Sequence, residues 1–339
     1  MRVISTNNGG LRELTWLLSL AVGGVLSLVA ETSSIPPSPE HATLIVVVGA
    51  PGEEAYGQAF AQWAGLWEDA ARKAGTRALV IGLKTNDAVP ARDQFEQALA
   101  AEPKSGPAEL WLVLIGHGTF DGKEAKFNVR DADVSATDLA NWLRPFTRPL
   151  AVVDTTSASS PFLSKLSGTN RVIITATRSG SEVNYSRLGE YLSEAIVDPE
   201  ADLDKDGQTS LLEAFLIASR RVKEFYDREG RLVTEHALLD DTGDGLGTPP
   251  DWFRGIRAVK KAKDGAMLDG LRAHQFHLVR SEAELKLSSE VRARRDALEL
   301  DIARLRETKR ELAEDVYYQK LEVLLLEVAQ LYERSASAP

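Results

Sequence analysis

The sequence predicts an α/β protein in which a parallel sheet carries helices on both faces and is followed by a long α-helical or coiled-coil C-terminal segment. Residues 43–50 (TLIVVVGA) form a continuous apolar run bounded by glycine and proline, which is typical of a strand buried on both faces. Such runs alternate with segments of helical periodicity, as βαβ units require. Beyond Gly265 charged residues dominate, and glycine and proline are missing between Gly270 and the final Pro339.

Each expected element rests on its own pattern. Strands are expected at the apolar runs 43–50, 77–83, 109–118, 149–156 and 171–177. Helices are expected where apolar residues recur every three or four positions, over 53–73, 92–101, 135–142, 185–196 and 211–226. We therefore expect an α/β domain over residues 43–264 and a helical arm over residues 265–339.

The helical arm carries two apolar stripes that are out of register with each other. The first consists of Leu298, Ile302, Leu305 and Leu312, and the second of Tyr317, Leu321, Leu324, Val328 and Leu331. A break in the helix is therefore expected near residues 312–317. The spacing allows an antiparallel hairpin that folds back on its own domain, and it also allows a coiled coil that pairs two copies into a homo-oligomer.

The first 30 residues have the pattern of a targeting segment. Arg2 and Arg12 lie in a basic start, residues 14–30 are apolar and uncharged, and the Pro- and Ser-containing stretch 31–42 follows as a linker. This pattern predicts a signal peptide cleaved after Ala30 and export to the periplasm or the exterior. A run of 17 residues is also long enough for a signal-anchor, so membrane attachment is expected only if residues 14–30 are retained.

Composition excludes several classes of function. The 339 residues contain 40 Lys and Arg against 50 Asp and Glu, and this formal charge of −10 disfavours a nucleic-acid groove. The chain contains no cysteine, which excludes disulfides, Cys-ligated metals and any cysteine nucleophile. No motif for an organic cofactor stands out.

Polar side chains follow two of the expected strands at their carboxyl ends, the edge at which parallel sheets bind ligands. The first is His117, flanked by Gly116 and Gly118, where an exposed imidazole and nearby backbone N–H groups could meet a ligand. The second is the hydroxyl-rich run 154–160 (DTTSASS), which fits a nucleophile turn or an ordinary helix cap.

The sequence over residues 43–235 resembles the cysteine peptidases of the caspase, legumain and gingipain group (clan CD), and its legumain-type members in particular. In that group a strand ending in His-Gly precedes, by 35–45 residues, a strand ending in Asp/Glu-x-Cys-x-Ser/Gly. His117 and Gly118 match the first element. The second aligns with Asp154–Ser159 and places Thr156 where the catalytic cysteine is expected.

Threonine is a poor substitute for that cysteine. A thiol with a pKa near 8.5 is readily held as a thiolate by an imidazole, whereas an alcohol needs a base within hydrogen-bonding reach. The resemblance therefore implies a catalytically inactive peptidase-like domain with a vestigial Thr156. The alternative is a Ser/Thr-dependent hydrolase that uses His117 with Thr156, Ser157 or Ser159.

Residues 202–213 fit the twelve-residue calcium loop D-x-D-x-D-G-x5-E. The ligands would be the carboxylates of positions one, three and five, the carbonyl of position seven and a bidentate glutamate at position twelve: Asp202, Asp204, Asp206, Gln208 and Glu213. Gly207 permits the sharp turn at position six. A full EF-hand is not expected, because Pro199 ends the entering helix early. We therefore expect a Ca²⁺ ion in this loop.

A second acidic stretch, residues 240–251, resembles a degenerate loop of the same kind, with Thr242 in a carboxylate position and Asp251 at the twelfth place. His274 and His277 are three residues apart, as metal ligands on a helix can be, but no carboxylate lies near them in the sequence. We interpret them as surface residues, and His236 as structural.

Together these patterns predict an exported, calcium-binding, catalytically inactive peptidase-like protein that acts as a scaffold or regulator and binds a protein or peptide partner. A third possibility is a membrane-tethered structural coiled-coil protein, in which the helical arm is the functional part.

Overall fold

The computed structural model describes residues 38, 41–84, 88–265 and 267–336, which belong to one compact unit, Pro37–Pro339. The expected targeting segment 1–30 and most of the linker lie outside the described residues. Among the helices of the described ranges, none has both the length and the apolar composition that crossing a bilayer requires.

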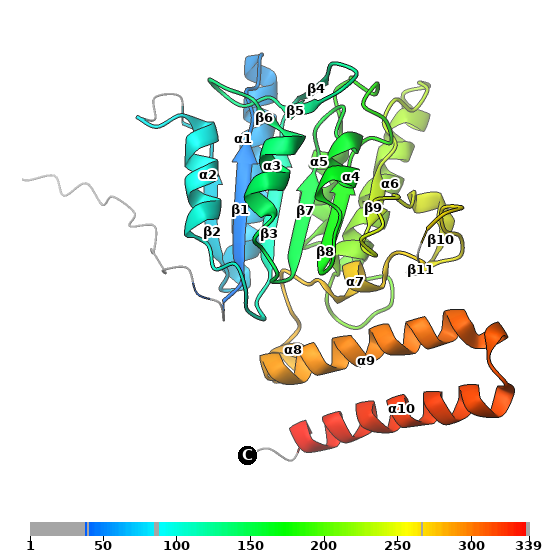
Figure 1. Ribbon diagram of the computed structural model, residues 1–339. Helices are drawn as coiled ribbons and strands as arrows, with labels where there is room; N and C mark the ends of the chain where they lie inside the picture. The colour runs from blue at the N-terminus through cyan, green and yellow to red at the C-terminus, as the bar shows by residue number, and fades with distance from the viewer. Residues whose placement is uncertain (1–37, 39–40, 85–87, 266, 337–339) are drawn as a thin grey trace, which may run out of the picture. The chain divides into compact units, whose positions relative to one another are not determined.

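A six-stranded sheet forms the centre of the fold (Figure 1). Its strands lie in the order β2 (Arg77–Ile81), β1 (Thr43–Val48), β3 (Leu110–Ile115), β7 (Leu150–Asp154), β8 (Arg171–Thr175) and β9 (Leu238–Asp240). All neighbours pair in parallel except β9, which runs antiparallel to β8. The predicted fold class, a mostly parallel sheet flanked by helices and followed by C-terminal helices, is confirmed.

Helices cover both faces of this sheet. One face packs against α1 (Glu54–Lys73), α5 (Leu188–Ala195) and α6 (Leu211–Arg228), and the other against α2 (Ala91–Ala101), α3 (Ala136–Leu143) and α4 (Ser160–Leu166). Alternate residues of β1 point to opposite faces, so Val46 belongs to the first core and Val47 to the second. This two-sided burial explains why the strands are apolar without interruption.

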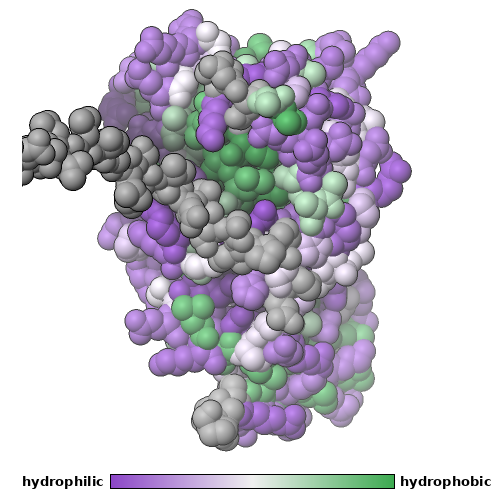
Figure 2. All heavy atoms as spheres, turned by 90° about the vertical axis from the view of Figure 1, so that its left-hand side faces the viewer, coloured by the Kyte–Doolittle hydropathy of each residue, from purple (hydrophilic) through white to green (hydrophobic). Residues whose placement is uncertain are grey.

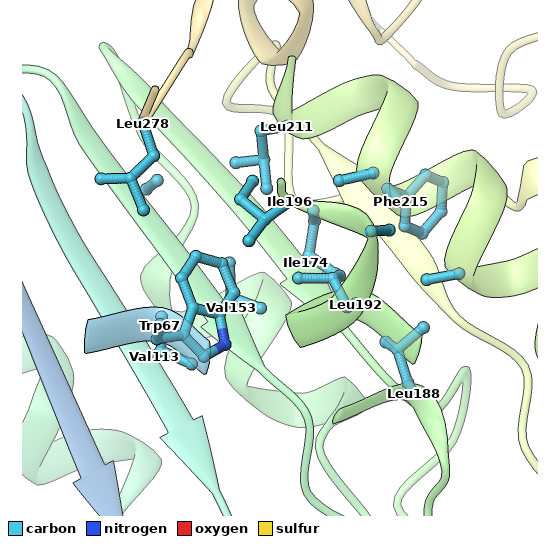
Figure 3. Packing of buried hydrophobic residues seen from close by; sticks show 14 of the residues in the cluster. Trp67, Val113, Val153, Ile174, Leu188, Leu192, Ile196, Leu211, Phe215 and Leu278 are labelled. Carbon is cyan, nitrogen blue, oxygen red and sulfur yellow. The ribbon is translucent and has the colours of Figure 1, made fainter. Parts of the chain in front are cut away.

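The core under α5 and α6 is built from large side chains (Figure 3). Trp67 of α1 and Phe215 of α6 are both buried, and Val153 and Ile174 of the sheet lie in the same cluster. A buried aromatic side chain removes about 150–250 Å² of surface from water. Each Å² of apolar surface buried in this way stabilises the fold by about 25 cal/mol. The sheet is therefore a rigid support for the loops that follow its strands.

Several short elements were not predicted from the sequence. Directly after His117, a small antiparallel sheet forms from β4 (Gly118–Phe120), β5 (Ala125–Phe127) and β6 (Val134–Ser135). The other short elements are η1 (Pro199–Ala201), η2 (Pro250–Trp252), β10 (Phe253–Arg254) and β11 (Arg257–Ala258). Strands of two or three residues are too short to show periodicity, and contacts elsewhere in the fold decide them.

The arm is a helical hairpin. After α7 (Leu271–Gln275) and α8 (Glu282–Leu285), α9 (Ser289–Glu307) and α10 (Glu314–Ala336) lie antiparallel, with the short turn η3 (Thr308–Glu311) between them (Figure 1). Arg294 pairs with Glu327 across the hairpin, and Leu298 is fully buried. The predicted break in the helix near residues 312–317 is present, and within the chain α9 and α10 fold back on each other as a hairpin.

The side of the molecule that carries α2 and β2 is mostly hydrophilic, with apolar surface gathered in one area (Figure 2). The edge strand β2 places the half-buried Leu79 and Val80 on this side.

Candidate functional site

The carboxyl ends of β3 and β7 meet through two reciprocal hydrogen bonds. The N–H of Gly118 donates to the hydroxyl oxygen of Ser157 at 3.1 Å, and that hydroxyl donates to the Gly118 carbonyl, also at 3.1 Å. A Cβ at Gly118 would lie 2.2 Å from the Ser157 carbonyl oxygen and 2.9 Å from Thr156 Oγ1. The close approach of the two strand ends therefore requires glycine at position 118.

His117 lies in an aromatic setting that the sequence did not reveal. Its ring makes edge-on contacts with Tyr56 and Phe60 of α1, at centroid distances of 5.1 and 5.4 Å. Tyr185 lies 6.1 Å away, and the ring atom Nε2 is 3.2 Å from the Pro51 carbonyl oxygen. The imidazole is therefore held by aromatic packing and by a backbone carbonyl.

Thr156, at the expected nucleophile position, is fully buried. Its hydroxyl donates to Asp154 Oδ1 at 2.7 Å, and its backbone N–H donates to the same oxygen at 3.0 Å. Because the threonine proton is directed at a carboxyl group two residues back, the hydroxyl is not paired with an imidazole.

Asp154 is itself an unusual group. It is 0% exposed, and its second oxygen, Oδ2, is buried without a hydrogen-bond partner in the described part of the chain. Burial raises the pKa of this carboxyl group from 3.8 to about 7, against the opposing effect of the two hydrogen bonds from Thr156. Near neutral pH, Asp154 is therefore poised between its charged and neutral forms.

The other hydroxyls of this run are also committed to structural contacts. Thr155 Oγ1 donates to the Leu114 carbonyl at 2.8 Å. Ser159 Oγ accepts from the N–H groups of Ala176 and Thr177, at 3.0 and 3.2 Å. Thr155, Ser157 and Ser159 are all buried. Among the described residues, no hydrogen bond joins His117 to any hydroxyl of residues 155–160, so the base and the alcohols do not form a catalytic pair in this arrangement.

The loop 202–213 brings three aspartates together. Asp202, Asp204 and Asp206 each offer an oxygen, and these oxygens lie within 4.8 Å of one another. The turn at Gly207 has φ +89°, which explains the need for glycine there. Glu213 lies in the first turn of α6 as part of a capping box with Ser210, and its Oε1 accepts from the N–H groups of Leu203 and Asp204.

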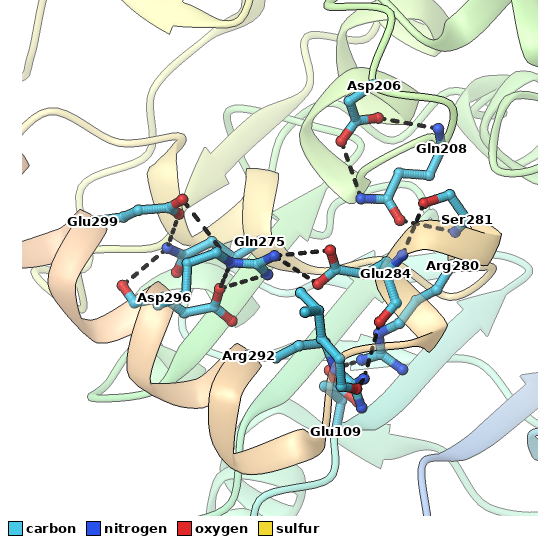
Figure 4. A network of polar contacts seen from close by, with 12 residues as sticks. Glu109, Asp206, Gln208, Gln275, Arg280, Ser281, Glu284, Arg292, Asp296 and Glu299 are labelled. Carbon is cyan, nitrogen blue, oxygen red and sulfur yellow. Dashed lines mark hydrogen bonds and ion pairs between the residues drawn. The ribbon is translucent and has the colours of Figure 1, made fainter. Parts of the chain in front are cut away.

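This loop also contacts the C-terminal segment. His274 Nε2 lies 2.9 Å from Asp204 Oδ2, and Asp204, Glu213 and His274 form a second group whose donor atoms lie within 4.8 Å. The Gln208 side chain bridges Asp206 and the backbone N–H of Ser281, both at 3.0 Å (Figure 4). The acidic loop is thus joined to α7 and to the start of α8. No sequence pattern predicted these contacts.

The second acidic stretch repeats the hydrogen bonds of the first. Asp240 accepts from the N–H groups three and five residues on, Gly243 and Gly245, as Asp202 does from Lys205 and Gly207. Lys205 and Gly243 both have positive φ.

The carboxylate that closes this second loop comes from a distant position. Asp269 accepts from the N–H groups of positions two and three, Asp241 and Thr242, and from the Thr248 hydroxyl. Glu213 accepts the equivalent bonds in the first loop. Asp251, expected at the twelfth place, is instead exposed in η2.

The remaining histidines differ from expectation in one case. His277 is buried, so its interpretation as a surface residue was wrong, because the arm covers it. His274 is half-buried. His236 Nδ1 lies 2.7 Å from Glu182 Oε1, which is in keeping with a structural role.

Comparison with known proteins gives similarity of fold only. No protein-family model and no curated protein matches the sequence. Among solved structures, the chain is similar to Caspase-1 from Spodoptera frugiperda, with 8% identity and a TM-score of 0.39 over 60% of this chain and 87% of that one. It is also similar to the Drosophila initiator caspase Dronc, with 12% identity and a TM-score of 0.38 over 65% and 88%. It is similar as well to Raptor from Chaetomium thermophilum, with 12% identity and a TM-score of 0.33 over 46% of this chain and 17% of that one. These values assign neither a peptidase family nor a catalytic residue.

Proposed function

We propose that this protein is a non-catalytic, peptidase-like α/β domain that works by binding, as a scaffold or regulator. The observation that carries the proposal is the Thr156 hydroxyl, which is buried and donates to Asp154 in a chain without cysteine. An alcohol needs a base within hydrogen-bonding reach to attack a carbonyl, and His117 instead meets the Pro51 carbonyl.

Calcium binding in residues 202–213 is the second part of the proposal. It is supported by the three convergent aspartates and by Glu213, which is positioned by backbone N–H groups. Oxygen donors of this number and charge suit Ca²⁺. Since Asp204 and Gln208 touch the segment that begins the arm, an ion here would stabilise the arm's attachment as well as the loop.

A partner surface on α10 is the third part. Tyr318, Leu325 and Tyr332 repeat every seven residues, and all three are exposed. The stripe is symmetric about Leu325, so a two-fold axis through Leu325 would pair Tyr318 of one copy with Tyr332 of the other. Export remains part of the proposal on the strength of residues 14–30, and fractionation of cells that express the full chain tests it.

Peptidase activity tests the central claim. The purified protein is incubated with fluorogenic peptides ending in Asn, Asp, Arg or Lys, and with a fluorophosphonate probe for activated serines and threonines. We expect no turnover and no labelling. Turnover or labelling that disappears in His117→Ala would instead establish the Ser/Thr-dependent hydrolase.

A further inference from the structure

A second candidate site lies at the opposite end of the sheet. A cavity of about 570 Å³ lies between the amino-terminal ends of β1, β3, β7 and β8 and the helix α9. Ala42, Glu109, Pro149 and Asn170, each directly before one of these strands, line it on one side. Its volume is in the range of small-molecule pockets, about 300–1,000 Å³.

The lining is rich in arginine although the chain as a whole is acidic. Five arginines line the cavity against four carboxylates, whereas the whole chain has a formal charge of −10. Three arginines have a carboxylate partner. Arg280 pairs with Glu109 (Figure 4), Arg295 pairs with Glu284 and Asp296, and Arg304 pairs with Asp301.

The other two arginines, Arg272 and Arg292, form no ion pair with a carboxylate among the described residues. Arg292 donates to the backbone carbonyls of Glu284 and Leu287, and no hydrogen bond or ion pair of Arg272 occurs in that part of the chain. Burial lowers the pKa of both guanidinium groups. Asp241 and Asp296 oppose this effect on Arg272, and Glu109 and Glu284 oppose it on Arg292, while Arg304 adds to it for Arg272 and Arg280 adds to it for Arg292. Two positive charges are thus partly desolvated, and carboxylates near them compensate only in part, without a direct ion pair.

His277 supplies an independent indication of a ligand. It is 6% exposed, it lines the cavity, and its Nε2 atom is buried without a hydrogen-bond partner. The ring donates to the Gln275 backbone, and burial lowers the pKa of His277 to about 4. The imidazole is therefore neutral, and Nε2 is an acceptor that lacks a donor.

We propose that this cavity binds a small, soluble phosphate ester that carries hydroxyl groups. Arg272 and Arg292 recognise the phosphate, since guanidinium forks match its oxygens in geometry and charge. His277 accepts a hydrogen bond from a ligand hydroxyl. A soluble ester fits better than a headgroup on a lipid surface, because the lining comes from strand ends on one side and from a helix on the other. The inference does not depend on the absence of catalysis at Thr156, since the cavity lies at the opposite end of the sheet from that residue.

Calorimetric titration of the full-length protein tests this assignment. The probes are inorganic phosphate, ribose 5-phosphate and AMP, with ribose and adenosine as phosphate-free controls. We expect ribose 5-phosphate and AMP to bind more tightly than inorganic phosphate, and the controls not to bind. Arg272→Gln and Arg292→Gln should each weaken binding at least tenfold, and His277→Phe should remove the preference for the sugar phosphate over inorganic phosphate.

Matched variants keep the test decisive. Arg306→Gln changes an exposed arginine of α9 outside the cavity and should leave affinity unchanged. Circular dichroism checks that each variant is folded. If Arg272→Gln does not fold, Arg272→Lys takes its place, because lysine keeps the charge but lacks the planar guanidinium group. Absence of binding by all phosphate probes at millimolar concentration overturns the proposal, and so does wild-type affinity in both arginine variants. Arg272-dependent sedimentation with phosphatidic acid vesicles, without binding of soluble esters, overturns the choice of a soluble ligand.

Discussion

Thr156 Oγ1 lies 2.7 Å from Asp154 Oδ1, and both side chains are fully buried behind the end of β7. This contact gives the Thr156 hydroxyl proton a carboxylate as its acceptor, with no imidazole paired to it in the described part of the chain. It also places a carboxyl group with a strongly raised pKa at the centre of the molecule.

The pKa of Asp154 predicts a pH dependence of stability. Folding raises this pKa from 3.8 to about 7, so the folded state holds a proton that the unfolded chain releases. The free energy of unfolding should therefore fall between pH 4 and 7, by up to about 4 kcal/mol, and level off above pH 7. Asp154→Asn keeps an oxygen for Thr156 and should flatten this part of the profile in urea denaturation. Equal slopes for the variant and the wild type would contradict the assignment.

Gly118 should be irreplaceable. Its Cβ would lie 2.2 Å from the Ser157 carbonyl oxygen, so Gly118→Ala forces the ends of β3 and β7 apart and should cost about 1–3 kcal/mol. Gly65 of α1 is the matched control, because a Cβ there meets nothing within 4 Å. Gly65→Ala should stabilise the protein by about 0.5–1 kcal/mol, because alanine favours a helix. Denaturant midpoints compare the two variants, and a tolerated Gly118→Ala would refute the close approach.

Calcium should raise the melting temperature. A ligand at 100 times its Kd adds about 2.7 kcal/mol, which corresponds to a shift of about 5–10 °C for a domain of this size. Asp204→Asn and Glu213→Gln should reduce the shift, while Asp301→Asn on α9 should not. The measurement is differential scanning fluorimetry in calcium and in EGTA. An unchanged melting temperature in the wild type would remove calcium from the proposed function.

The arm should be held to the domain by Leu298. This fully buried residue of α9 lies in the part of the hairpin next to α7, and Leu298→Ala should cost about 2–5 kcal/mol. Limited trypsin digestion should then release the hairpin earlier than in the wild type. Val323→Ala, on the exposed side of α10, is the control and should leave the digestion pattern unchanged.

Self-association through α10 should depend on Leu325, which is 49% exposed. Sedimentation equilibrium should show a concentration-dependent dimer for the wild type and a monomer for Leu325→Glu, because a charge at the symmetry axis would face its own copy. A wild-type protein that stays monomeric at all concentrations would rule out this surface for self-pairing.

The elements that depend on a continuous pattern of apolar residues could be predicted from the sequence. The uninterrupted apolar run of β1 and the stripes of α9 and α10 predicted a buried sheet and a broken helical arm. Contacts between residues that are far apart in the sequence could not be predicted from it. Tyr56 and Tyr185 are 129 positions apart yet stack at 4.7 Å beside His117, and Asp269 closes a loop that begins at Asp240. Such contacts have no local signature, because side-chain packing across the whole fold creates them.

The hydroxyl run after β7 limits which substitutions this segment can accept. Thr155 hydrogen-bonds this segment to β3, and Ser159 hydrogen-bonds it to the residues that follow β8. Side chains that resemble available nucleophiles therefore join neighbouring strand ends. A substitution that placed a different reactive group at either position would remove one of these hydrogen bonds. The attachment of this segment to the sheet therefore depends on its hydroxyl groups.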